Sequence, residues 1–549
     1  MIPLCSEGAH NALSCRRRRN STALLVLVAV AGLTLDARAP ASPAAEASYQ
    51  EPFRPQFHFS PAKNWTNDPN GLVFYKGEYH LFYQFNPFGD EWGHMSWGHA
   101  VSRDLVHWQH LPVAIPEAHG TMIFSGSAVV DWHNSSGFCH NAEAQDHSCL
   151  VAIYTGYRAA AGSTPQNQSQ YLAYSNDRGR TWTPYARNPI IDLHLADFRD
   201  PKVFWHAPSR KWVMATVLAP QHKVRFFGST DLKHWSALSD FGPAGAVGGV
   251  WECPDLFPLA VDGDPRDVRW VLSVNLNPGG VAGGSGDQYF IGRFDGTTFS
   301  NDNPAAETLW ADYGADFYAS TSFSDIPPQD GRRIWMGWLD NWEYAARLPT
   351  RPWRGQQSIP RALGLKRFPD GIRLVQEPVR EMQTLRSPLL STAGLTVDAA
   401  NRRVASQSVR GDTLEIEAEF APGAASEFGL KLRKGASEET IVGIDSAKSL
   451  LFVDRTRSGN SSFDPKFPSR HTAPLHLAAG RPVRIHVFVD RSSLEVFGGA
   501  GESVISDLIF PSPESQGLEL YSKGGEARIV KLTVWRLGGM WTGSKPAGR

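Results

Sequence analysis

Asn64–Gly71, with the sequence Asn-Trp-Thr-Asn-Asp-Pro-Asn-Gly, leads directly into the apolar segment 72–75, Leu-Val-Phe-Tyr. Pro69 fixes φ at the second position of a turn, and Asn70 and Gly71 tolerate left-handed backbone geometry. The stretch therefore predicts the entry into a β-hairpin. Asp68 stands between an amide and this proline, so the same turn also presents an acidic side chain.

The chain around this turn is built from short β-rich runs between residue 57 and about residue 373. Examples are residues 79–83, 150–154, 212–217 and 270–274, and Gly, Pro, Asn and Asp separate them. No window keeps helical periodicity for three turns. This region is therefore predicted to be all-β.

A Ser-x-Asp signature followed by tryptophan recurs within the region, at residues 102–108, 175–182 and 229–235, with a weaker relative at 294–296. Each copy predicts a strand that ends, turns and resumes at an aromatic residue. The starts lie 73 and 54 residues apart, which is blade-sized although irregular. Similar hairpins repeated over about 300 residues predict a β-propeller of about five blades, placed at residues 50–380.

Two further carboxylates have settings like that of Asp68. They are Asp200 in Phe-Arg-Asp-Pro (198–201) and Glu252 in Trp-Glu-Cys-Pro-Asp (251–255). In a propeller, residues distant in sequence converge where the innermost strands meet the central channel. We therefore expect the three acids to share one funnel.

Three such acids suit the cleavage of a glycosidic bond. A retaining glycosidase needs an ionised carboxylate to attack the anomeric carbon and a protonated carboxyl to donate to the leaving oxygen. Asp68, in a turn where amides can hydrogen-bond it, suits the nucleophile. Glu252, among apolar neighbours, suits the acid. Asp200, beside Arg199, is expected to stay ionised and to bind sugar hydroxyls.

Beyond about residue 378 tryptophan becomes scarce and the strands alternate more cleanly, as at residues 414–420, 483–489 and 493–497. Such alternation means one buried and one wet face, which is typical of a two-sheet sandwich. A β-sandwich is predicted at residues 385–538.

Residues 1–39 have the features of an export signal. Four arginines (16–19) precede an apolar core (23–35) and a small-x-small cleavage site (37–39). A secreted or periplasmic protein is expected, with no membrane span once the signal is removed.

Cys139 and Cys149 flank a polar loop and can either form a local disulfide or stay free. Cys253 is then expected to be a small, buried, unpaired residue.

The formal net charge of −1 over 549 residues gives no field that favours nucleic acid, anionic lipid or a charged polymer. A neutral substrate fits this balance. No Cys or His spacing resembles a zinc site, and the chemistry requires no metal or organic cofactor.

The sequence resembles the β-fructosidases of glycoside hydrolase family 32, through residues 67–71, 198–201 and 251–255 and through Asp-Arg-Ser-Ser-Leu-Glu-Val-Phe at 490–497. The resemblance implies a five-bladed propeller joined to a sandwich and net retention of configuration. It makes Asp68 the nucleophile, Asp200 the transition-state stabiliser and Glu252 the general acid/base. Thr66, where the family usually has methionine, is a departure beside the motif.

The resemblance also implies a set of fructose-binding positions. Trp342 is the first choice for the tryptophan of the pocket wall, with Trp335 and Trp338 as alternatives. The full set is Asn67, Gln84, Trp92, Phe124, Ser125, Arg199 and Trp342.

Residues 96–99, 283–290 and 312–318 are similar to the exo-inulinase and exo-levanase branch. The prediction is an exo-acting fructan β-fructosidase that also splits sucrose. A sucrose-restricted invertase, an endo-acting enzyme and a catalytically lapsed fructan-binding protein remain alternatives.

Arabinan-type hydrolases and sialidases share the architecture. The former usually invert, with a wider carboxylate gap, and the latter need an arginine cluster and a tyrosine nucleophile.

Overall fold

The computed structural model describes residues 49–140, 147–162, 164–478 and 480–541. The predicted export signal, residues 1–39, lies outside these residues. Within the described residues, no helix has the length and apolar character that a membrane crossing needs.

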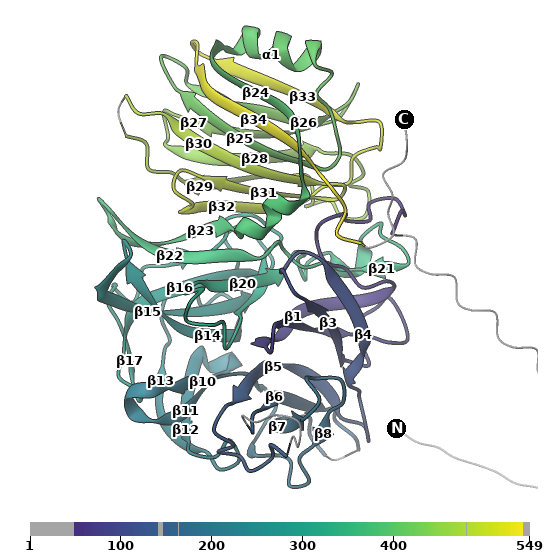
Figure 1. Ribbon diagram of the computed structural model, residues 1–549, viewed down its shortest axis with the longest axis vertical. Coiled ribbons are helices and arrows are strands. Elements are labelled where there is room, and N and C mark those ends of the chain that lie inside the picture. Colours follow the sequence, from purple (N-terminus) through teal and green to yellow (C-terminus); the bar gives the residue numbers. More distant parts are fainter. Residues whose placement is uncertain (1–48, 141–146, 163, 479, 542–549) are drawn as a thin grey trace, which may run out of the picture. The chain divides into compact units, whose positions relative to one another are not determined.

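The first part of the described chain is all-β, as predicted, and its strands form four sheets (Figure 1). In spatial order the first sheet contains β21 (Trp353–Arg354), β1 (Asn64–Tyr75), β2 (Glu78–Phe85), β3 (Ser96–Ser102) and β4 (Trp108–Ile115). The second contains β5 (Met122–Asp131), β6 (Cys149–Arg158), β7 (Asn167–Ser175) and β8 (Thr183–Pro184), and β9 (Ile191–Leu195) pairs with β7. The third contains β10 (Phe198–His206), β11 (Lys211–Leu218), β12 (Lys223–Ser229) and β13 (Ser236–Phe241).

The fourth sheet is larger because two sets of strands meet in it. In spatial order it contains β17 (Phe299–Asn301), β16 (Gly286–Phe294), β15 (Asp264–Asn277), β14 (Val250–Val261), β22 (Arg361–Phe368), β20 (Arg333–Trp338) and β19 (Tyr318–Ser322). β18 (Leu309–Trp310) pairs with β16, and β23 (Gly371–Pro378) pairs with β22. The two sets are joined by a single residue pair, Val261 with Leu365.

One strand from each of the first three sheets, and one from each of the two sets in the fourth sheet, lies at the centre of the arrangement. β1 contacts β5, β5 contacts β10, β10 contacts β14, β14 contacts β19, and β19 contacts β1. The contacts therefore close into a ring, from which the remaining strands of each sheet extend outward as hairpins. This is the organisation of a β-propeller.

The Ser-x-Asp signatures occupy the predicted turns at the end of β3, β7 and β12. At the first copy, Ser102 Oγ donates to Asp104, whose carboxylate accepts the N–H groups of Val106 and His107. The Trp108 indole then donates to the carbonyl of Leu105. Equivalent indole bonds close the other two turns, from Trp182 to Gly179 and from Trp235 to Leu232. The repeated sequence therefore reflects a repeated turn.

The second part of the chain is the predicted β-sandwich. Its two sheets enclose an aliphatic core, and α1 (Val397–Ser406), which the sequence analysis did not predict, packs on β24 and β33. One sheet contains β24 (Arg386–Thr396), β34 (Arg528–Leu537), β25 (Leu414–Ala421), β30 (Val483–Asp490), β31 (Ser493–Gly498) and β32 (Ser503–Leu508). The other contains β29 (Arg470–Pro474), β28 (Leu450–Arg457), β27 (Glu439–Asp445), β26 (Glu427–Lys434) and β33 (Gly517–Lys523). Short 3-10 helices occur at Ala207–Ser209, Ala219–Gln221, Ala345–Arg347 and Arg380–Leu385.

Buried charges join the two parts. The fully buried ring of His58 lies between Asp490 and Glu495, with Nδ1 2.8 Å from Asp490 Oδ2 and Nε2 2.9 Å from Glu495 Oε1. Arg361 also pairs with Glu495 and, at 3.0 Å, with Asp312. The acids of the 490–497 motif therefore act at the junction between propeller and sandwich.

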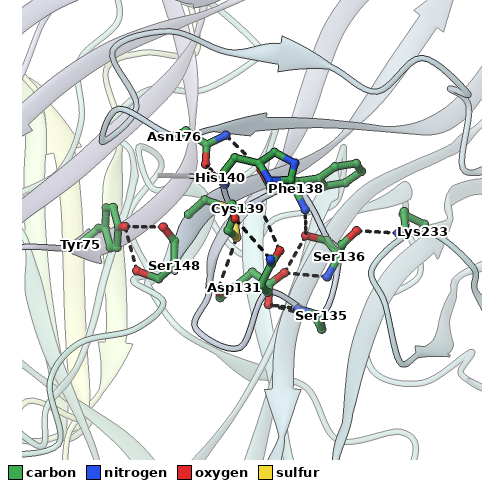
Figure 2. The surroundings of a disulfide bond; sticks show 12 residues. Tyr75, Asp131, Ser135, Ser136, Phe138, Cys139, His140, Ser148, Asn176 and Lys233 are labelled. Carbon is green, nitrogen blue, oxygen red and sulfur yellow. Dashed lines mark hydrogen bonds between the residues drawn. A yellow bond between two sulfur atoms is a disulfide. The ribbon is translucent and has the colours of Figure 1, made fainter. Parts of the chain in front are cut away.

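Cys139 and Cys149 form a disulfide with their Cα atoms 5.1 Å apart, which resolves the alternative that the sequence left open. Figure 2 shows its surroundings. Asp131, at the end of β5, accepts hydrogen bonds from the backbone and hydroxyl groups of Ser135 and Ser136. The loop at 131–139 is therefore held at both ends.

Candidate active site

Every strand of the central ring is irregular at the same level of the propeller. β-Bulges insert extra residues, bend the strand and redirect side chains, and they are frequent beside active sites. The pairing register shifts between Thr66 and Pro69 in β1, Ile123 and Gly126 in β5, Arg199 and Lys202 in β10, Glu252 and Asp255 in β14, and Tyr318 and Thr321 in β19.

Proline in the motifs explains three of these irregularities. Pro201 and Pro254 lie inside the shifted segments of β10 and β14, and Pro69 is the residue at which the shift in β1 ends; proline cannot donate to a strand ladder, so it is tolerated at a bulge. Asp200 and Cys253 have left-handed backbones, with φ of 64° and 43°. The sequence motifs therefore encode a local break in each strand, and each break turns a carboxylate toward the channel.

The breaks open into one pocket of about 300 Å³, which we call the funnel. All ten residues predicted from the sequence line it, together with four others that the sequence analysis did not select. The predicted residues are Asn67, Asp68, Gln84, Trp92, Phe124, Ser125, Arg199, Asp200, Glu252 and Trp342, and the additional ones are Tyr157, Gln166, Gln168 and Asp197.

Asp68 is buried on the funnel floor and accepts several hydrogen bonds. Ser125 Oγ donates to Oδ2 at 2.5 Å, Asn67 Nδ2 donates to Oδ1 at 3.0 Å, and the Cys253 thiol lies 3.5 Å from Oδ2. Burial raises the pKa of Asp68, the Ser125 hydrogen bond lowers it, and the nearby Glu252 charge raises it again. The net direction is upward, so the donors only partly offset the loss of water.

Asp200 is held by backbone rather than by side-chain donors. The Cys253 N–H donates to Oδ2 at 3.0 Å, while Arg199 Nε lies 3.8 Å from the same oxygen. Burial has the largest influence on the Asp200 carboxyl and raises its pKa. The Arg199 charge lowers this pKa, and the charges of Glu252 and Asp68 raise it. The net effect is a pKa of about 7. The expectation that Asp200 stays ionised is therefore wrong below about pH 7, since burial outweighs the arginine.

Glu252 is the most accessible of the three acids, with its side chain 20% exposed. Arg199 lies beside Oε1, with Nη2 at 3.1 Å and Nε at 3.2 Å, and the Tyr318 hydroxyl donates to Oε2. Burial raises the pKa of Tyr318 well above its usual value, and the Glu252 charge raises it further, so the phenol keeps its proton as a donor. Both oxygens of Glu252 are thus oriented by the protein.

Tyr318 is a residue that the sequence analysis used only for its resemblance to one branch of the family. Its motif, residues 312–318, contained no signal that the phenol faces Glu252, because the contact joins β14 to β19. Gln168 was also missed, and its Oε1 accepts from Arg199 Nη1 at 3.2 Å.

Aromatic side chains form the funnel wall. Trp342 stacks on Trp65 with ring centroids 5.8 Å apart, and Trp92, which is 46% exposed, lies 6.0 Å from Phe124. The alternatives Trp335 and Trp338 are fully buried and do not line the funnel. Gln84 donates to the carbonyl of Ile123 and to Asn70 Oδ1, which fixes its amide at the wall.

Three convergent carboxylates in an aromatic funnel, at the centre of a β-propeller, define a glycoside hydrolase. The chain matches the model of the glycosyl hydrolases family 32 N-terminal domain over residues 58–378, and that of the family 32 C terminal over residues 381–536. The chain belongs to glycoside hydrolase family 32.

Individual relatives agree with this assignment. A levanase of Bacillus subtilis is 53% identical over 91% of this chain and 72% of its own length. An extracellular exo-inulinase of Aspergillus niger is 44% identical over 90% of this chain and 96% of its own length. Among solved structures, the exo-inulinase of Aspergillus awamori matches with a TM-score of 0.82 and 41% identity, covering 90% of this chain and 100% of that one.

Proposed function

We propose that this protein is a retaining exo-β-fructosidase that releases terminal β-D-fructofuranosyl residues from inulin- or levan-type fructans and from sucrose. The observation that carries the proposal is the convergence of Asp68, Asp200 and Glu252 in one funnel. The levanase and exo-inulinase relatives support the choice of substrate class.

In the proposed first step, the Asp68 carboxylate attacks C2 of the terminal fructosyl unit. The bond from C2 to the leaving oxygen breaks, and that oxygen takes the proton of the Glu252 carboxyl. In the second step Glu252 accepts a proton from water, the water oxygen attacks C2, and the ester bond to Asp68 breaks. Each acid then has its initial charge, and fructose leaves with its configuration retained.

Asp200 is proposed to stabilise the transition state. Its carboxylate is buried beside Asp68 and Glu252, where a hydrogen bond to a fructose hydroxyl strengthens as positive charge develops on the ring. Binding such a hydroxyl also supplies the donor that the Asp200 carboxylate needs to stay ionised at neutral pH. Arg199 orients Glu252 and contributes positive charge beside both acids.

The remaining funnel residues are proposed to bind the terminal fructose. The polar side chains of Asn67, Gln84 and Ser125 can bond hydroxyls, and Trp92, Phe124 and Trp342 offer ring faces and edges. Below the funnel the channel narrows to a space of about 20 Å³ beside Pro69 and Pro201. A space this small holds about one water molecule and cannot pass a sugar chain, so only a chain end can reach the funnel floor, which supports exo-action.

The finer features of the fold are part of the same proposal. We propose five blades, a propeller at residues 50–380 and a sandwich at 385–538, supported by the closed ring of five strands and the single pair that joins β14 to β22. Residues 1–39 are proposed to direct export, leaving a secreted or periplasmic enzyme.

A time course on inulin, levan and sucrose, with products separated by size, tests this function. Fructose alone is expected from both polymers from the first time point. Early short oligomers would mean endo-action, and cleavage of sucrose alone would mean an invertase. The Glu252→Gln variant is expected to lose about 10²–10⁴-fold in kcat, the usual contribution of a general acid.

A further inference from the structure

A second pocket, of about 560 Å³, opens at the opposite end of the propeller channel, and we call it the distal pocket. The funnel is lined by the starts of the ring strands, whereas the distal pocket is lined by the ends of β5, β10 and β14 and by residues after β19. Phe204, in its wall, lies four residues beyond Asp200 along β10, which is roughly 13 Å at the usual strand rise. The two pockets share no lining residue, although Lys202 in the floor of the distal pocket lies only two residues beyond Asp200.

Tryptophans form the rim of the distal pocket. Trp132 is 44% exposed and Trp205 is 41% exposed, and Trp212 and Trp270 lie in the wall. Among the described residues, the exposed Phe and Trp side chains are these two rim tryptophans with Phe88 and Trp92. Trp92 lines the funnel, so each of the three exposed tryptophans among the described residues lines a pocket.

The floor of the distal pocket is polar but balanced in charge. Lys202 lies 3.2 Å from Asp255, and Asp325 accepts the Trp132 indole N–H and the Val130 N–H, both at 2.9 Å. Arg333 lies in the same floor and donates to the Phe323 carbonyl at 3.1 Å. Of the residues that line the pocket, Lys202 and Arg333 are cations and Asp131 and Asp325 are carboxylates, so these charges balance and the polar floor offers both donors and acceptors to a neutral polyol.

The rim is held in place before any ligand arrives. Trp132 follows Asp131 at the start of the segment that leads to Cys139, and Figure 2 shows how the hydrogen bonds of Asp131 fix Ser135 and Ser136 in that segment. Ser135 in turn accepts the Trp212 indole N–H at 2.9 Å. A rigid aromatic rim loses little conformational entropy on binding.

From this combination we infer that the distal pocket binds a fructan segment remote from the end being cleaved. Apolar faces of furanose rings stack on Trp132 and Trp205, while the floor bonds hydroxyls. The inference rests on the proposed function, because that function supplies the polymer. A second attachment point raises the local concentration of chain ends at the funnel and does not alter the cleavage of sucrose.

The test uses the full chain carrying Glu252→Gln, so that inulin is bound without being cut, and calorimetric titration with long-chain inulin. Two classes of site per chain are expected. Adding Trp205→Ala should weaken one class by about three- to tenfold, as expected for one lost aromatic contact. Trp535→Ala, which removes a partly buried tryptophan of the sandwich that stacks on Arg386, is the matched control and should change neither class.

In the otherwise unaltered enzyme, Trp205→Ala should lower kcat/KM on long inulin by a similar factor and leave sucrose hydrolysis unchanged. Trp132→Ala, with its folding checked by thermal denaturation, should behave in the same way. A single class of site, binding unchanged in both tryptophan variants, or a pocket that takes an apolar dye but no inulin would overturn the inference. Loss of sucrose and inulin hydrolysis in the parent enzyme would instead overturn the proposed function.

Discussion

The hydrogen bond from Ser125 to Asp68 gives the most quantitative prediction. Ser125 Oγ lies 2.5 Å from Asp68 Oδ2, and both side chains are buried. Burial raises the pKa of Asp68, and this hydroxyl is the strongest influence in the opposite direction. Asp68 must be ionised to attack, so the variant Ser125→Ala should need a higher pH to reach full activity.

The size of the effect follows from the charge on the acceptor. A hydrogen bond to a charged group contributes about 1.5–3 kcal/mol. Because Asn67 and Cys253 still contact the carboxylate, we use the lower end of this range. At about 1.4 kcal/mol per pH unit, the acidic limb of kcat/KM should move upward by about one pH unit.

The assay is kcat/KM on sucrose against pH, since this ratio reports the ionisation of the free enzyme. Activity should fall about tenfold on the acidic side, and the plateau should fall less. Ser125→Thr keeps a hydroxyl and is the control that should hold the limb near its original position. A limb that stays in place in Ser125→Ala, or moves to lower pH, would refute the reasoning.

Two further predictions concern other buried groups. Tyr318→Phe removes the phenol that donates to Glu252 and should lower kcat by about 10–100-fold with little change in KM. The control is Tyr157→Phe, in the same funnel, which should lower kcat much less. Equal losses of kcat in the two variants would contradict a positioning role for Tyr318. For His58, burial lowers the pKa but hydrogen bonds to two carboxylates outweigh it and raise the pKa to about 9 from 6.5. Its stabilising contribution is therefore complete below about pH 6.5 and is lost as pH rises through about 9. The thermal denaturation midpoint should fall over this window more steeply in the wild type than in His58→Gln, and parallel curves would contradict the assignment.

The positions of the three acids could be predicted because each lies in a short local motif. Aspartate before proline specifies a strand that breaks, and repeated Ser-x-Asp turns specify blades, so Asp68 and Asp200 could be placed in one channel without any contact being known. Trp342 was placed in the wall by the resemblance to the family, and no local motif marked it. The resemblance ranked Trp342 first but kept Trp335 and Trp338 as alternatives, because the burial of these two depends on packing between blades.

What the sequence could not predict are effects that several strands produce together. The raised pKa of Asp200 arises from burial and from two other acids that lie far away in sequence, whereas the neighbouring Arg199 suggested the opposite. Tyr318 in β19 contacts Glu252 in β14, and these neighbouring strands belong to different blades. The 490–497 motif could be recognised as a strand, but its sequence does not show that Asp490 and Glu495 contact His58, which lies near the other end of the chain.

The anomeric configuration of the transferred fructose tests the central claim most directly. In aqueous methanol, the fructosyl group that Asp68 is proposed to hold can pass to methanol as well as to water, and the methyl glycoside does not mutarotate. NMR of the first methyl fructofuranoside formed from sucrose should show the β-anomer alone, which double displacement by Asp68 and Glu252 requires. Formation of the α-anomer would mean direct displacement by the acceptor, and the roles assigned to these acids would be wrong.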